Sequence, residues 1–94
     1  MSSLAGAVCD VTIVNKRGLH ARAAAKLVNA AERFSAEILV SHDDQSVSAP
    51  SIMGLMMLGA GLGAVVQLSA SGADAVQALE AVRAIIAAGF NEQD

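Results

Sequence analysis

VCDVTIVNKRGLHARAAAKLVNAAERF, residues 8–34 of the chain, carries a strand signal, a turn signal and a helix signal in one run. The alternating, β-branched residues at its start predict a strand over 8–14. In that strand Cys9, Val11 and Ile13 are expected to face a core. A polar turn over 15–18 follows, and the alanine-rich run 21–33 predicts an amphipathic helix. The apolar face of that helix consists of Ala24, Leu27, Val28 and Ala31.

After this run, strand and helix signals continue to alternate. The predicted strands are 36–42, 46–49 and 65–70, and a short helix is predicted over 52–58. Ser51 is a good N-cap for the short helix, and Gly59 is expected to end it. Residues 43–45 are expected to form the turn between the first two of these strands.

The last helix signal begins at Asp74, a predicted N-cap that Gln77 would complete as a capping box. The predicted buried stripe of this helix consists of Val76, Leu79, Val82 and Ile86. Gly89 is expected to end the helix, with Phe90 packed back over its last turn. We expect one domain over residues 1–94, with a core of about residues 8–90 and frayed ends that include the tail 91–94.

The predicted order of elements is therefore β-α-β-β-α-β-α. Alternating strands and amphipathic helices favour an α+β fold with one antiparallel sheet covered on one face. A ferredoxin-like fold has almost the same order. A ferredoxin-like regulatory or small-ligand-binding module is thus an alternative hypothesis for this chain.

The composition of the 94 residues argues against several functions. The chain is 54% hydrophobic and 16% charged, which excludes a disordered protein. A net charge of −3 and 2% aromatic residues argue against a nucleic-acid partner. The single cysteine, Cys9, cannot form an internal disulfide and fits a reducing compartment, so we expect a cytoplasmic protein. Cys9, His20 and His42 lack the spacing of metal ligands, and neither a metal nor a cofactor is expected.

One uncharged stretch, between Asp44 and Asp74, resembles a membrane span at first sight. Its most apolar part, residues 52–66, is shorter than the roughly 18–20 residues that a spanning helix needs. Glycines at 59, 61 and 63 also interrupt it. We therefore expect no insertion into a membrane.

Four of the six cations lie close together, with no acidic residue between them: Lys16, Arg17, Arg22 and Lys26. His20 lies among them, after a glycine-containing turn and at the start of the predicted helix. A helix N-terminus binds anions, and an arginine two residues on can donate a fork of hydrogen bonds to phosphoryl oxygens. Since a neutral imidazole can act as a nucleophile, these residues predict a histidine that binds or accepts phosphate. The alternative is a surface histidine in a solvated basic turn.

Two blocks of sequence resemble a known family. Residues 15–22, NKRGLHAR, resemble the signature of HPr, the histidine-containing phosphocarrier of the bacterial phosphotransferase system. Residues 51–59, SIMGLMMLG, resemble the regulatory-serine motif of that family. The order and separation of the two blocks match the family, and the resemblance spans about residues 8–88.

The resemblance implies a fold and a reaction. The fold would be an HPr-like open-faced β-sandwich, with a four-stranded antiparallel sheet of order 1-4-2-3 and three helices on one face. In the reaction, enzyme I charged from phosphoenolpyruvate would phosphorylate His20 at Nδ1, and the phosphoryl group would pass to an EIIA-type protein. Arg22 would stabilise the phosphate. Such a protein is a phosphoryl carrier rather than an enzyme, and we expect it to act as a monomer.

The second block carries two further predictions. Ser51 is a plain N-cap by its position, and the resemblance adds phosphorylation by HPr kinase/phosphorylase. The helix after it is apolar all round, so some of its side chains must face solvent, and exposed methionine-rich patches suit several partners. By the resemblance, Ile52, Met53 and Met56 would dock enzyme I and EIIA beside His20.

One position departs from the family, because Ala23 stands where the family usually has proline. Proline fixes φ in a first helical turn, whereas alanine is a good helix former and restores an N–H group. We expect a slightly less rigid helix start and unchanged chemistry. The residues around His20 fit both the sugar-uptake branch of the system and its nitrogen-related regulatory branch.

Overall fold

The computed structural model describes residues 6–92. Its strands are β1 (Gly6–Thr12), β2 (Glu37–His42), β3 (Gln45–Ser48) and β4 (Val65–Ser71). Its helices are α1 (Ala21–Ala31), α2 (Ile52–Met57) and α3 (Ala75–Ala87), followed by the 3₁₀ turn η1 (Gly89–Asn91). The predicted order of strands and helices is confirmed, with boundaries that differ by one or two residues.

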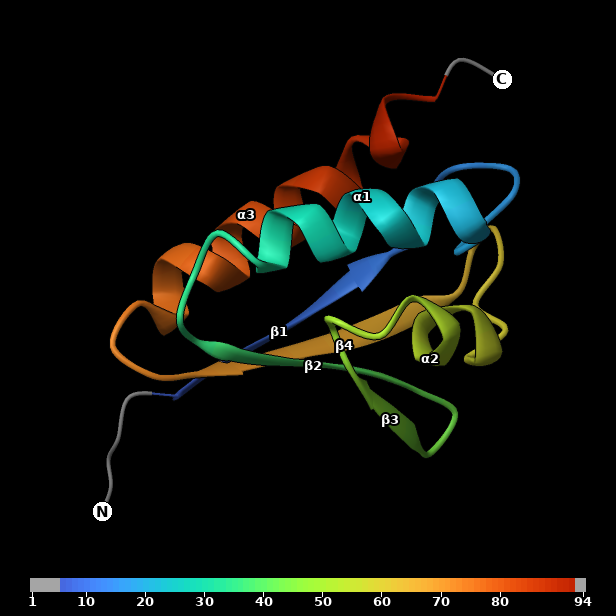
Figure 1. The fold of residues 1–94 in the computed structure, drawn as a ribbon. Coiled ribbons are helices and arrows are strands. Elements are labelled where there is room, and N and C mark those ends of the chain that lie inside the picture. Colours follow the sequence, from blue (N-terminus) through green and yellow to red (C-terminus); the bar gives the residue numbers. More distant parts are fainter. Residues whose placement is uncertain (1–5, 93–94) are drawn as a thin grey trace.

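The four strands form one antiparallel sheet in the order β1-β4-β2-β3, which confirms the expected arrangement. β4 lies in the interior of the sheet, between β1 and β2. It pairs with β1, where Val66 lies opposite Val11, and with β2, where Leu68 lies opposite Val40. α1 and α3 pack side by side over one face of this sheet, and α2 packs against α1 (Figure 1). No helix of residues 6–92 covers the opposite face (Figure 1).

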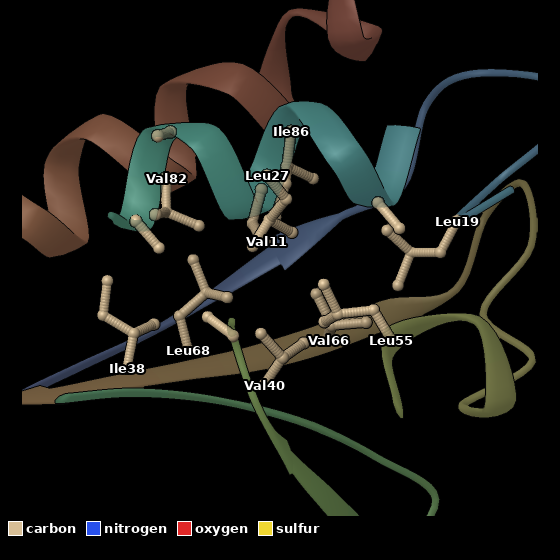
Figure 2. Close-up of a cluster of buried hydrophobic side chains, with 14 of the residues drawn as sticks. Val11, Leu19, Leu27, Ile38, Val40, Leu55, Val66, Leu68, Val82 and Ile86 are labelled. Atoms are coloured by element: carbon tan, nitrogen blue, oxygen red, sulfur yellow. The ribbon is translucent and has the colours of Figure 1, made fainter. Parts of the chain in front are cut away.

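The core fills the space between the sheet and the helices. Figure 2 shows side chains from the strands and from α1, α2 and α3 meeting in one cluster. Leu19, which immediately precedes His20, belongs to it, as does Leu55 of α2. The two sequence blocks that carry the candidate chemistry are therefore anchored in the same core.

Two predictions for α3 are wrong. Val76 is 63% exposed, because the buried face follows the i, i+4, i+7 spacing that starts one residue earlier, at Ala75. Asp74 precedes the helix but makes no side-chain cap hydrogen bond, so Asp74 and Gln77 form no capping box. The Asp74 carboxylate instead accepts hydrogen bonds from the backbone amides of Ser35, at 3.0 Å, and Ala36, at 2.8 Å. The amide of Ser35 is the main reason that the pKa of Asp74 lies below its ordinary value.

The segment after α3 folds back on the molecule. Gly89 has a φ of +66°, as expected for the end of a helix, and Phe90 is fully buried, which confirms its predicted packing. In the tail that was expected to fray, Asn91 completes the 3₁₀ turn, and Glu92 makes side-chain contacts with Asn15 and His20. Residues 93–94 lie outside the described part of the chain. Among residues 6–92, no helix is long and apolar enough to cross a membrane.

Candidate functional site

His20 lies at the N-terminus of α1. Its backbone is extended, with φ −76° and ψ 177°, and its side chain makes no cap hydrogen bond. The carbonyl of His20 accepts a hydrogen bond from the amide of Ala24 at 2.8 Å. The amides of residues 21–23 precede this bond and have no acceptor within the helix. They add to the positive end of the helix dipole beside the imidazole, a setting that favours an anion.

The loop that carries His20 is fixed by close backbone contacts. The amide of Leu19 donates to the carbonyl of Ala60 at 3.1 Å, which joins this loop to the segment between α2 and β4. Gly18 has a φ of +63°, and a Cβ atom there would lie 2.4 Å from the oxygen of Ala60. Only glycine fits this position, because both the backbone angle and the close approach exclude a side chain.

The imidazole of His20 is paired with a carboxylate from the other end of the chain. Its Nε2 atom contacts Oε2 of Glu92, and the two side chains are 19% and 11% exposed. The other oxygen of that carboxylate, Oε1, accepts a hydrogen bond from Nδ2 of Asn15 at 3.1 Å. Nothing in the sequence places Glu92 here, because the two partners are 72 positions apart.

The ionisation of Glu92 determines which nitrogen of the ring carries a proton. The hydrogen bond from His20 is the largest cause that holds the pKa of Glu92 below its ordinary value, and the bond from Asn15 adds to it, although partial burial opposes both. An ionised carboxylate only accepts hydrogen bonds, so Nε2 of His20 must be the donor. The lone pair of a neutral His20 ring therefore resides on Nδ1.

The four cations of the His20 loop and of α1 differ in exposure and in contacts. Lys16, Arg17 and Arg22 are exposed in the loop and in the first turn of α1. Lys26 is half-buried, and its Nζ atom donates a hydrogen bond to the carbonyl of Phe90 at 2.6 Å. Within residues 6–92, Lys16, Arg17 and Arg22 pair with no acidic side chain, whereas Lys26 binds the turn that precedes Glu92.

Ser51 is the N-cap of α2. Its exposed side-chain oxygen, Oγ, accepts a hydrogen bond from the amide of Gly54 at 3.0 Å, which confirms the predicted cap. A Cβ atom on Gly54 would lie 3.0 Å from this oxygen and 3.1 Å from the Cβ atom of Val47. A side chain at position 54 would crowd the capping hydroxyl of Ser51, and glycine avoids this contact.

An apolar surface surrounds α2. The predicted docking residues are exposed: Ile52 by 39%, Met53 by 72% and Met56 by 44%. Met57 and Leu62, which the sequence analysis did not select, are even more exposed, at 75% and 62%. Leu55 alone in α2 is fully buried and anchors the helix.

The remaining sequence features lie apart from this arrangement. The side chain of His42 is 16% exposed, and its Nδ1 atom lies 3.4 Å from the carbonyl of Val65. Residues 6–92 contain no group of three or more histidine, cysteine, aspartate or glutamate side chains that could hold a metal ion. Ala23, at the position of the family's proline, is fully buried in α1, which begins at Ala21.

Comparison with known proteins identifies the family. The family described as PTS HPr component phosphorylation site matches residues 8–88. The chain is 48% identical over 83 residues to the phosphocarrier protein HPr of Cupriavidus necator, covering 88% of this chain and 93% of the relative. It is also 48% identical over 83 residues to the phosphocarrier protein NPr of Shewanella violacea, covering 88% and 91%.

A solved structure of an HPr protein has the same fold as this chain. The crystal structure of HPr-C-His from Thermoanaerobacter tengcongensis superposes with a TM-score of 0.89 at 44% identity, covering 94% of this chain and 99% of that one. These matches favour the expected sandwich over the ferredoxin-like alternative. The chain belongs to the HPr family of phosphocarrier proteins, which serve the phosphotransferase system as carriers rather than as enzymes.

Proposed function

We propose that this chain accepts a phosphoryl group from phospho-enzyme I on Nδ1 of His20 and passes it to a histidine of an EIIA-type protein in the cytoplasm. The observation that carries this proposal is the position of His20 at the N-terminus of α1. The exposed cations Lys16, Arg17 and Arg22 lie in the same loop and first turn. Free amides, a helix dipole and nearby cations stabilise a phosphate without burying it, so that donor and acceptor can both reach it.

The transfer requires no proton to move at Nδ1. The lone pair of Nδ1 attacks phosphorus, the bond between phosphorus and its donor atom on enzyme I breaks, and the bonding electrons return to that atom. The guanidinium of Arg22 is suited to the charge that the phosphoryl oxygens carry during this displacement. Transfer to the EIIA-type acceptor repeats the same step, with His20 as the leaving group.

Regulation at Ser51 is the second part of the proposal. The hydroxyl is exposed at a helix N-terminus, where a phosphate is electrostatically tolerated. The apolar surface of Ile52, Met53 and Met56 begins at the next residue, and we assign to it the docking of enzyme I and EIIA. Phosphorylation by an HPr kinase/phosphorylase would place about −1.5 to −2 charges at the edge of this surface and weaken docking there.

Incubation with enzyme I and phosphoenolpyruvate, followed by intact-mass measurement, tests the main proposal. The wild-type chain should gain one acid-labile phosphoryl group, His42→Ala should gain it equally, and His20→Ala should gain none. The His42→Ala variant is a matched control, because His42 is the other histidine of the chain and is also largely shielded from solvent. Label that remains in His20→Ala contradicts the proposal.

A further inference from the structure

We propose that Glu92 is a positioning residue for phosphoryl transfer at His20. Its carboxylate holds the ring proton on Nε2 and stabilises the positive charge that the ring acquires when Nδ1 binds phosphorus. This inference rests on the proposed function of His20 and adds a residue that neither sequence block contains. Three independent features of the structure support it: the contacts of the carboxylate, the turn that delivers it, and the charges around the ring.

Both oxygens of the Glu92 carboxylate are engaged. Oε2 pairs with Nε2 of His20, and Oε1 accepts a hydrogen bond from Nδ2 of Asn15. The same nitrogen of Asn15 donates to the carbonyl of Gly18 at 2.9 Å. Since two acceptors face this nitrogen, the amide can be oriented in only one way. Asn15 is 6% exposed, so a buried side chain holds the carboxylate against the ring.

The turn that delivers Glu92 is held from two sides. Gly89, Phe90 and Asn91 have φ values of +66°, +57° and +60°, a left-handed run that reverses the chain after α3. Such an angle is uncommon for a bulky residue such as phenylalanine and persists where the surroundings enforce it. Here the ring of Phe90 is fully buried in the core, and its carbonyl accepts the hydrogen bond from Lys26.

The carboxylate meets a specific need of the reaction. In the free protein the neutral ring donates its Nε2 proton to Glu92 and keeps a lone pair on Nδ1. When that lone pair forms the bond to phosphorus, the proton on Nε2 stays and the ring becomes cationic. A neighbouring carboxylate interacts more strongly with this cation than with the neutral ring. The contact therefore stabilises the product and the transition state more than the reactant, which is the condition for faster transfer.

The other charges near the ring make this contact more important. The loop and helix that carry His20 contribute Lys16, Arg17, Arg22 and Lys26, all of them cations, and the segment 58–64 packed against the loop carries no titratable side chain. These cations favour the phosphate but oppose a positive imidazole. Glu92 offsets that opposition at the ring itself.

Glu92→Gln tests the inference, because it keeps the shape of the side chain and removes its charge. Since a charge-assisted hydrogen bond is about twice as strong as a neutral one, kcat for phosphorylation by phospho-enzyme I should fall by about five- to tenfold. The KM for enzyme I should stay unchanged, because the ring contact lies outside the apolar docking surface. In phosphorylated, ¹⁵N-labelled protein, the ring of the variant should lose its Nε2 proton at a lower pH than the ring of the wild type.

Glu80→Gln is the matched control, since Glu80 is an exposed carboxylate of α3 that pairs only with its neighbour Arg83 in the described structure. It should match the wild type in both measurements, and Glu92→Asp, which keeps the charge on a shorter arm, should recover part of the rate. A Glu92→Gln variant with wild-type kcat and wild-type titration of the phosphorylated ring overturns the inference. A wild-type chain that takes no phosphate on His20 instead overturns the proposed function.

Discussion

The backbone amide of Leu19 donates a hydrogen bond to the carbonyl of Ala60 at 3.1 Å, which ties the loop that carries His20 to the segment that follows α2. The loop of His20 and the segment that follows the helix capped by Ser51 are therefore in direct contact, although their sequence blocks are separated by β2 and β3. A partner that docks on the apolar side chains of α2 also lies close to the loop of His20.

Gly18→Ala should disrupt the contact between the two segments. The new Cβ atom would lie 2.4 Å from the oxygen of Ala60, and the residue would keep a positive φ, so the free energy of unfolding should fall by about 2–4 kcal/mol. Gly59→Ala is the control, since Gly59 also has a positive φ, of +69°, but a Cβ atom added there would meet no neighbouring group within 4 Å. Urea unfolding measures both, and equal losses would show that the approach to Ala60 does not matter.

Arg22→Ala should slow the transfer without unfolding the protein. Removing a charge-assisted contact to the phosphoryl group typically costs about 1.5–3 kcal/mol, which corresponds to a rate lower by roughly ten- to hundredfold. Rapid-quench measurement of transfer from phospho-enzyme I gives the rate. Arg33→Ala removes an exposed arginine just beyond the other end of α1 and should leave the rate unchanged. Equal rates in the two variants would contradict a role for Arg22.

Ser51→Asp should weaken the binding of enzyme I and slow phosphorylation of His20. The added charge lies beside Ile52 and Met53, and burying it against an apolar partner surface costs free energy. Ser51→Ala should lose only the bond to the Gly54 amide, about 1 kcal/mol of stability, and should transfer phosphate almost normally. Titration of enzyme I against both variants is the measurement. If the two bind and react alike, Ser51 acts as a cap alone.

Acid should weaken the fold through two carboxylates. The pKa values of Glu92 and Asp74 lie below their ordinary values, so each side chain binds protons more weakly in the folded state than in the unfolded chain. Their contributions to stability are present at neutral pH and are lost as the pH falls through these lowered values. The free energy of unfolding of Glu92→Gln should therefore decline less on acidification than that of the wild type. An identical decline, measured by urea unfolding at several pH values, would contradict the contact with His20.

Most of the fold could be predicted from local signals. Alternating β-branched residues, the N-cap Ser51 and the helix-ending Gly59 and Gly89 are each determined by neighbours in the chain, and the structure confirms them. The strand order came from the resemblance to the family, because local patterns do not specify which strands pair. Asp74 shows the limit of local rules. Its carboxylate was expected to cap its own helix, but the amides of Ser35 and Ala36, brought close by the fold, bind it instead.

The candidate site also contains residues whose positions could be predicted from the sequence and residues whose positions could not. His20, Arg22 and Ser51 lie in short blocks whose spacing already indicates a helix start, so their positions could be predicted. The position of Glu92 could not, because its contact with His20 depends on a left-handed turn that is held by the packing of Phe90 and by the hydrogen bond from Lys26. A polar residue such as Asn15 gives no sign in the sequence that it is buried. One of its hydrogen bonds is local, to the carbonyl of Gly18, but the other forms only when the fold brings Glu92 to the loop.

The position of the phosphorus atom tests the central claim most directly. Protein labelled with ¹⁵N in its histidines is phosphorylated with enzyme I and phosphoenolpyruvate, and the coupling between phosphorus and the ring nitrogens is measured by NMR. The account predicts phosphorus bonded to Nδ1 of His20, with the proton retained on Nε2. Phosphorus on Nε2 of His20, on His42, or on a residue other than histidine would contradict it.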